Sequence, residues 1–214
     1  MSSNLKQRLF TSFFLFFLII LIFKFYIFLL YSLIVIGILS VLEFFNLIKK
    51  IFKNRLYIFF SNIFFVSYVF SFCLLFFLLS AQNDLKLLIF IILLSCISSD
   101  IGGLAFGKIL KGPKLSKISP NKTFSGAAGS LLMSSITFSL LINYFYKVLS
   151  FEFILIGFLI SIGCQIGDLF FSYLKRKAKL KDTGSLLPGH GGILDRLDGI
   201  FLGLPVGLIF INII

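Results

Sequence analysis

Two carboxylates close to the C-terminus have the spacing and the neighbours of a cation site. Asp195 and Asp198 are three residues apart, so a helix would present both on one face. Just before them, residues 188–192 read Pro-Gly-His-Gly-Gly, a turn able to bring bare backbone N–H groups close to an anion. A basic run, 175–181, lies upstream. Carboxylates beside concentrated cations suggest Mg²⁺ with phosphates, because Mg²⁺ is usually held by one or two carboxylates together with phosphate oxygens.

A third carboxylate, Asp168, lies inside an apolar stretch of the chain. A carboxylate in a membrane span is costly and is therefore a candidate functional group. Helical spacing places it on one face with four other polar residues, Ser161, Gln165, Ser172 and Lys175. We interpret this stripe as functional. The structural alternative is a hydrogen bond between helices made by one polar residue.

Other polar groups carry weaker signals. Glu43, Asp84 and Glu152 lie near the ends of apolar runs, where we expect them to be solvated at the membrane interface. His190 stands between glycines and could be an acid or base, a hydrogen-bond donor to phosphate, or a turn residue. The Gly-rich stretch 99–108 suits either close phosphate approach or close helix packing.

The elements that position these groups follow from the composition. Apolar residues make up 59% of the 214 residues and charged residues 13%, and phenylalanine alone contributes 31. A soluble domain has about 45–50% apolar and about 25% charged residues. A soluble enzyme, a disordered tail and a disulfide scaffold are therefore excluded, and the chain is an integral membrane protein. The net charge of +12 reflects orientation in the membrane better than it reflects nucleic-acid binding.

A span needs about 20 apolar residues. Without the alternation of a β-barrel, the apolar runs predict an all-α, polytopic membrane helix bundle of about seven transmembrane helices. The third run could be one long tilted helix or a broken one, and the last is short for a full span. The predicted spans are 9–23, 25–46, 56–80, 86–106, 125–147, 151–174 and 199–214.

Basic residues are unevenly divided between the two sides that seven spans would create. Seventeen of the 20 fall in the N-terminus and in the loops near 47–55, 107–124 and 175–198. By the positive-inside rule this side faces the cytoplasm, and with it the N-terminus. We expect membrane helices in 1–98 and a catalytic membrane region in 99–214, with cytoplasmic loops 107–124 and 175–198.

The polar C-terminal motifs resemble those of a known family. The segment 172–198, SYLKRKAKLKDTGSLLPGHGGILDRLD, which we name the signature segment, closely resembles the signature of phosphatidate cytidylyltransferases, also called CDP-diacylglycerol synthases. The preceding Gly-Asp-Leu at 167–169 and the Ser-Pro-x-Lys-Thr element at 119–123 also resemble the family. The resemblance covers about residues 99–210. It departs at Ser125, where the family usually has Glu, and in the Ala-Phe-Gly-Lys stretch at 105–108.

The resemblance implies a reaction in which CTP and phosphatidic acid give CDP-diacylglycerol and pyrophosphate, with Mg²⁺ as cofactor. The phosphatidate phosphate would attack the α-phosphorus of CTP with no covalent enzyme intermediate, so catalysis would be positioning and charge neutralisation. The implied partners are CTP, phosphatidic acid and the lipid bilayer, in the inner (plasma) membrane with the site facing the cytoplasm. Nucleic acid is not expected, and a homodimer is left open.

The resemblance also assigns roles by motif position. Asp168 and Asp195, with Asp198 as a further candidate, would hold the metal. Lys175, Arg176 and Lys181 would grip phosphates, and Asp182 would orient a lysine. Contacts to substrate would come from Ser119, Lys122, Thr123, Ser172, His190, Gly191, Gly192 and Arg196.

Two other functions stay open at this point. In a CTP-dependent lipid kinase, an oxygen of the lipid would attack the γ-phosphorus of CTP, and CDP would be released. An ion-coupled membrane transporter would use Asp168 on an ion pathway. The clustering of the polar groups on one side of the membrane argues against the transporter, and a purely structural scaffold gives no reason for so many carboxylates and glycines.

Overall fold

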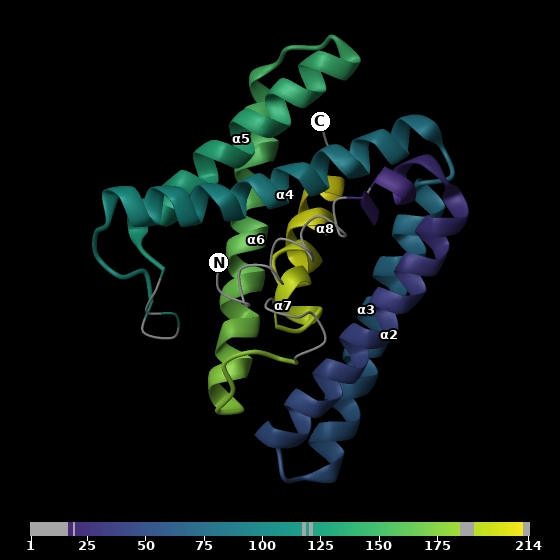
Figure 1. Cartoon of the computed structure of the whole chain (residues 1–214), viewed down its shortest axis with the longest axis vertical. Helices are drawn as coiled ribbons and strands as arrows, with labels where there is room; N and C mark the ends of the chain where they lie inside the picture. Colours follow the sequence, from purple (N-terminus) through teal and green to yellow (C-terminus); the bar gives the residue numbers. More distant parts are fainter. Residues whose placement is uncertain (1–16, 19, 117–118, 120–121, 185–190, 212–214) are drawn as a thin grey trace, which may run out of the picture. The chain divides into compact units, whose positions relative to one another are not determined.

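The computed structural model describes residues 17–18, 20–116, 119, 122–184 and 191–211. Within these ranges the regular structure is helical, and the β structure is limited to isolated bridge residues, among them the pair Lys114 and Thr123. This confirms the all-α fold class. The helices are α2 (Tyr26–Ile51), α3 (Arg55–Leu79), α4 (Asn83–Leu110), α5 (Phe124–Tyr146), α6 (Phe151–Lys177), α7 (Leu194–Leu197) and α8 (Ile200–Ile211) (Figure 1).

Five of the described helices, α2 to α6, are long and apolar enough to cross a membrane, so the chain is a polytopic membrane protein. The third predicted span is a single continuous helix, α3. The short last run forms α8, whose 12 residues fall below the about 20 that a span needs. The first predicted span, 9–23, lies largely outside the described residues.

The chain divides into two compact units. The first contains residues 1–78 and 174–197, and so combines α2 and α3 with the end of α6 and with α7. The second contains residues 79–173 and 198–214, and so combines α4, α5, most of α6 and α8. The signature segment therefore contributes to both units, since its middle belongs to the first and its ends to the second.

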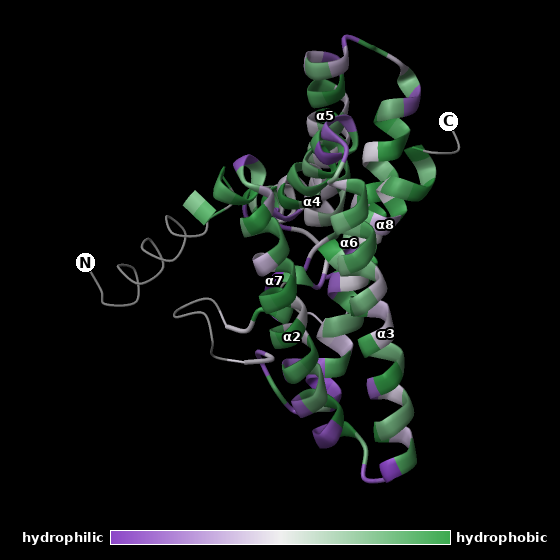
Figure 2. Cartoon of the chain, turned by 90° about the vertical axis from the view of Figure 1, so that its right-hand side faces the viewer, coloured by the Kyte–Doolittle hydropathy of each residue, from purple (hydrophilic) through white to green (hydrophobic). Residues whose placement is uncertain are grey.

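In the first unit, α2 and α3 lie side by side (Figure 1). The rings of Phe44 and Phe65 stack with centroids 3.8 Å apart, and the Tyr26 hydroxyl donates to the carbonyl of Phe77 at 3.2 Å. Hydrophobic residues follow both helices, and hydrophilic residues gather where the two join (Figure 2). This distribution is typical of a helical hairpin that crosses the membrane and turns in water.

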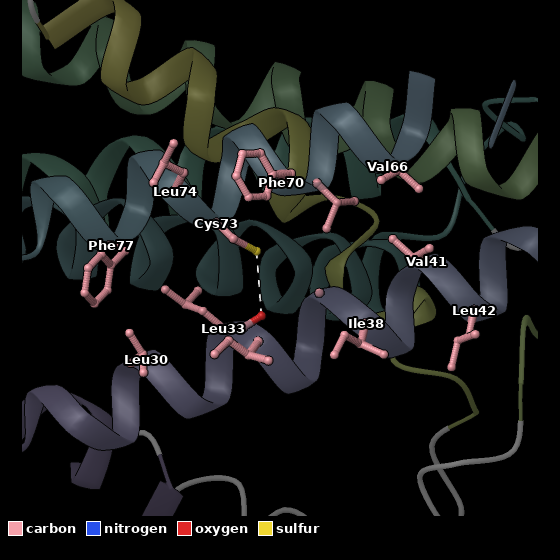
Figure 3. Close-up of a pocket in the computed structure, with 13 residues that line it drawn as sticks. Leu30, Leu33, Ile38, Val41, Leu42, Val66, Phe70, Cys73, Leu74 and Phe77 are labelled. Carbon is pink, nitrogen blue, oxygen red and sulfur yellow. Dashed lines mark hydrogen bonds between the residues drawn. The ribbon is translucent and has the colours of Figure 1, made fainter. Parts of the chain in front are cut away.

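A groove of about 450 Å³ separates parts of α2 and α3 (Figure 3). Its lining is aliphatic and aromatic apart from Gly37 and Cys73, and the Cys73 thiol donates to the carbonyl of Leu33 at 3.7 Å. A groove with this lining suits a surface that faces hydrocarbon, where polar groups are costly.

The second unit is held together by close approach of helix backbones. A Cβ atom on Gly102 of α4 would lie 2.6 Å from the carbonyl oxygen of Gly129 in α5, and one on Gly126 would lie 2.8 Å from that of Gly103. Small residues permit such approach between membrane helices. Of the two interpretations of the stretch 99–108, close phosphate approach and close helix packing, the structure supports helix packing.

Candidate functional site

The polar stripe on α6 carries two kinds of interaction. Near its start, the Ser161 hydroxyl lies 2.8 Å from that of Ser99, and the Gln165 amide donates to the carbonyl of Ala127 at 3.3 Å. These are bonds between helices, as the structural alternative predicted. Asp168 differs, because its carboxylate forms an ion pair with Lys122, 46 residues away. The stripe is therefore structural at one end and presents an ion pair at the other.

The loop between α4 and α5 positions Lys122. The backbone N–H of Leu115 donates to the carbonyl of Lys122 at 2.8 Å, and the N–H of Lys122 donates to that of Ser119 at 3.1 Å. These backbone bonds fix the place of Lys122 beside α6. They also bring the predicted residues Ser119 and Lys122 into one turn.

Thr123 has a local role at the start of α5. Its Oγ1 accepts a hydrogen bond from the N–H of Gly126 at 3.1 Å, which makes it the N-cap of the helix. Its neighbour Ser125 stands where the family usually has Glu, and its hydroxyl donates to the carbonyl of Lys111. Ser125 therefore fastens the same loop that carries Lys122.

The Asp168 carboxylate is partly open. Its side chain is 31% exposed, and Lys122 engages only Oδ2. Oδ1 accepts no hydrogen bond from the residues that the structure describes. Those residues contain no group of three or more His, Cys, Asp or Glu that could hold a metal. This donor set fits Mg²⁺ that arrives with a nucleotide, because such an ion needs only one or two carboxylates besides phosphates and waters.

Asp198 is less accessible than Asp168, whereas Ser172 is half-buried like Asp168. Asp198 is 8% exposed, and its Oδ1 accepts from the N–H of Gly199 at 2.9 Å. A Cβ atom on Gly167 would collide with the carbonyl oxygen of Asp198, so this glycine permits α6 to contact the chain just before α8. Ser172, half-buried, follows Asp168 by four residues on α6.

In the first unit, Asp195 of α7 is the centre of a second cluster. Its Oδ1 accepts from the Lys175 ammonium at 2.8 Å, and its Oδ2 accepts from the N–H groups of Thr183 at 2.8 Å and Gly192 at 3.0 Å. Burial of the carboxylate raises its pKa, but the bonds from Lys175, Gly192 and Thr183 outweigh burial and hold the pKa below its ordinary value. Asp195 is therefore a charged group that organises the signature segment around itself.

Backbone geometry shapes the chain around Asp195. After α6, Lys179 adopts a left-handed conformation with φ of 57°, and the N–H of Leu180 bonds the carbonyl of Lys175 at 2.8 Å. Gly191 has φ of 83°, and a Cβ atom there would lie 3.0 Å from Oδ2 of Asp195. Glycine is required at this position because other residues rarely adopt that φ.

Four of the remaining predicted residues of the signature segment are exposed. The exposed ones are Arg176, Lys181, Asp182 and Arg196. Asp182, which was predicted to orient a lysine, forms no ion pair with any described residue. The carboxylate that orients Lys175 is instead Asp195. His190 lies outside the described residues.

Glu43 is the residue that sequence reasoning missed. Asp84 and Glu152 are exposed, as expected for interfacial groups, but Glu43 is 4% exposed. Its carboxylate accepts from the Thr183 hydroxyl at 2.7 Å and from the N–H groups of Ile193 at 3.0 Å and Leu194 at 2.9 Å. The prediction of interfacial solvation is wrong for this residue. The available signal was its place inside an apolar helix.

The two clusters share a chemistry. Each contains one carboxylate held by one lysine, Asp168 with Lys122 and Asp195 with Lys175. The exposed cations of the signature segment add positive charge near Asp195. Each cluster by itself thus combines a carboxylate that can ligate a hard cation with a lysine that can neutralise phosphate, which are groups suited to a nucleoside triphosphate.

Comparison with known proteins agrees with this chemistry. The model of the "Cytidylyltransferase family" matches residues 1–214. The relatives include proteins named phosphatidate cytidylyltransferase from Rickettsia bellii, Helicobacter pylori and Mycobacterium leprae. They are 42%, 40% and 38% identical over 133, 130 and 113 residues, which is 57%, 57% and 52% of this chain. These stretches cover 57%, 47% and 36% of the relatives, so the chain matches about half of their length.

Proposed function

Because the chain belongs to the cytidylyltransferase family, we propose that it transfers the cytidylyl group of CTP to phosphatidic acid, giving CDP-diacylglycerol and pyrophosphate. The observation that carries the proposal is the ion pair between Lys122 and Asp168. It joins the Ser-Pro-x-Lys-Thr element to the Gly-Asp-Leu element, two motifs that the sequence separates by more than 40 residues. Relatives named phosphatidate cytidylyltransferase support the same substrates.

The reaction exchanges one phosphorus–oxygen bond for another. A phosphate oxygen of phosphatidic acid forms a bond to the α-phosphorus of CTP, and the bond from that phosphorus to the bridging α–β oxygen breaks. Pyrophosphate leaves with the electron pair. No covalent intermediate on the protein is needed, so the protein contributes position and charge neutralisation.

The lysines would neutralise the charge of the reacting phosphates. Lys122 and Lys175 are each prealigned by a carboxylate, which fixes the ammonium before substrate arrives. Arg176 and Lys181 are exposed to water, from which phosphates would reach them, and Arg176 also donates to the carbonyl of Leu180 at 3.4 Å. Prealignment lowers the reorganisation needed during the reaction, which is the general advantage of a preformed charged site.

Asp168 is the first candidate ligand for Mg²⁺, and Asp195 and Asp198 are further candidates. When bound, the ion neutralises phosphate charge and polarises the reacting phosphorus. Asp168 is the more open carboxylate, since one of its oxygens accepts no bond from the described residues. Both oxygens of Asp195 already accept bonds, so a cation there would share them with Lys175, Thr183 and Gly192.

We place the site at the cytoplasmic face of the inner membrane. The supporting observation is the distribution of basic residues, which gather in the segments that carry Lys122 and the signature segment. Phosphatidic acid would enter from the bilayer and CTP from water.

Product analysis tests the proposal. Purified protein in vesicles that contain phosphatidic acid should convert CTP into pyrophosphate and a cytidine-containing lipid in equal amounts. Release of CDP without cytidine in the lipid would indicate the kinase alternative. Flux across sealed vesicles without consumption of CTP would indicate a transporter. Either result would overturn the proposal.

A further inference from the structure

We propose that Glu43 is a positioning residue for the proposed cytidylyl transfer, in which a membrane-helix carboxylate holds the signature segment in its reactive conformation. The inference rests on the proposed function for its activity readout, and on contacts within the first unit for its structural basis. Glu43 lies on α2, a membrane-spanning helix, and its bonding partners Thr183, Ile193 and Leu194 all belong to the signature segment.

The bonds use both oxygens of the carboxylate. Oε2 accepts from the Thr183 hydroxyl and from the N–H of Leu194, and Oε1 accepts from the N–H of Ile193. An ionised carboxylate only accepts hydrogen bonds, whereas an amide of equal size has one accepting and one donating end. The three donors around Glu43 therefore match a carboxylate. A glutamine at this position could not accept all three hydrogen bonds.

The residues that bond Glu43 include or adjoin two of the residues that hold Asp195, Thr183 and Gly192. Thr183 bonds Glu43 through its side chain and Asp195 through its backbone N–H. At the start of α7, Gly192 donates to Asp195, and the next two residues donate to Glu43. Any displacement of the segment from Glu43 would therefore disturb the bonds that orient Asp195 and, through it, Lys175.

The fit around Glu43 is close. A Cβ atom on Gly184 would lie 2.7 Å from Oε1 of Glu43. A Cβ atom on Gly192 would collide with Oε2 of Glu43 and with the Thr183 hydroxyl. The glycines of the segment thus admit the carboxylate, and the carboxylate replaces the water that buried N–H groups would otherwise need.

Two pairs of variants separate positioning from mere packing. Glu43→Gln keeps the volume and removes the second acceptor, and Glu152→Gln, on an exposed carboxylate of α6, is its matched control. Thr183→Val keeps the shape and removes the hydroxyl, whereas Thr183→Ser keeps the hydroxyl and removes a methyl group. If Thr183 serves packing, Thr183→Ser should lower kcat more than Thr183→Val does. If it serves positioning through its hydroxyl, Thr183→Val should lower kcat more.

The experiment uses the full chain, purified and reconstituted with phosphatidic acid. We expect Glu43→Gln and Thr183→Val each to lower kcat by about tenfold or more, the usual consequence of leaving buried donors unpaired. The kcat of Thr183→Ser and of Glu152→Gln should stay within about twofold of the wild-type kcat, since both variants keep the hydrogen bonds to Glu43. A wild-type kcat in Glu43→Gln, or a larger loss in Thr183→Ser than in Thr183→Val, would overturn the proposal.

Amide hydrogen exchange gives a readout that needs no turnover. In Glu43→Gln, the amides of Ile193 and Leu194 should exchange faster, while those in the middle of α5 should keep the wild-type rate. Unchanged exchange at both amides would overturn the inference. If the wild type itself forms no cytidine-containing lipid, the proposed function fails, and exchange still decides whether Glu43 holds the segment.

Discussion

The ammonium of Lys175 and the carboxylate of Asp195 are 2.8 Å apart, and their side chains are only 12% and 7% exposed. One group ends a membrane-spanning helix and the other begins the short helix α7. Between them the chain turns back on itself, and the same carboxylate also accepts from the N–H groups of Thr183 and Gly192. This one acid therefore sets the conformation of a basic segment that would otherwise repel itself.

Removal of the lysine should be costly. We expect Lys175→Met to lower both the thermal midpoint and the activity, because loss of one partner of a buried ion pair leaves an uncompensated charge and costs about 3–5 kcal/mol. Lys179→Met, on an exposed lysine of the same segment, is the control and should behave like the wild type. Differential scanning of the purified variants measures the effect. Equal midpoints for the two variants would show that the pair contributes nothing.

The Lys122–Asp168 pair should behave in the opposite way. Asp168→Asn should reduce liponucleotide formation by about a hundredfold or more if Asp168 neutralises or ligates charge in the transition state. The thermal midpoint should change little, because a pair whose side chains are 27% and 31% exposed contributes about 1 kcal/mol or less. Asp84→Asn, on an exposed acid at the start of α4, is the matched control. Full activity in purified Asp168→Asn would refute the assignment.

The stability contributed by Asp195 should depend on pH. Its pKa is lowered in the folded protein, so its contribution is fully present above the unfolded value of about 3.9 and is lost as the pH falls through the folded value. The difference in midpoint between the wild type and Asp195→Asn should thus be constant at neutral pH and shrink in acid. A difference that persists unchanged well below pH 3.9 would contradict the hydrogen-bonding account.

The fold could be predicted further than the site. Apolar runs of sufficient length located α2 to α6, because the thickness of a bilayer fixes the length of a span. The cost of intramembrane charge also selected Asp168, which pairs with Lys122. Both predictions rest on local sequence and on the solvent, and neither needs knowledge of distant contacts.

Glu43 shows where local reasoning ends. Its position near the end of an apolar run indicated solvation, but its partner Thr183 lies 140 residues away. No spacing rule connects positions so far apart, since their contact depends on how α2 packs against the middle of the signature segment. The same limit applies to Asp195, whose partner Lys175 lies 20 residues away.

Gly192 offers a test of the close fit. Gly192→Ala should abolish most activity, because the added methyl group would collide with the carboxylate of Glu43 and the hydroxyl of Thr183. Gly37→Ala is the control, since its methyl group would meet Cys73 at 3.4 Å and Val69 at 3.6 Å, which is ordinary contact. Activity and amide exchange of the signature segment measure the outcome. If Gly192→Ala keeps the wild-type activity and the wild-type amide exchange, the signature segment tolerates a larger distance between residue 192 and Glu43.

The proposed metal dependence can be tested by chelation and by titration with Mg²⁺. With no group of three metal-ligating residues in the described parts of the chain, Mg²⁺ should bind weakly alone and tightly with CTP. Chelation should silence the enzyme and added Mg²⁺ should restore it. Titration with and without nucleotide measures the linkage, and turnover that survives chelation would count against the proposed chemistry.

The most direct test of cytidylyl transfer follows each phosphorus of CTP. Purified protein in phosphatidic-acid vesicles would receive CTP labelled at the α-phosphorus in one sample and at the γ-phosphorus in another. If the protein transfers the cytidylyl group, the α label should enter the lipid and the γ label should appear in pyrophosphate, in equal amounts. Entry of the γ label into the lipid would contradict this transfer.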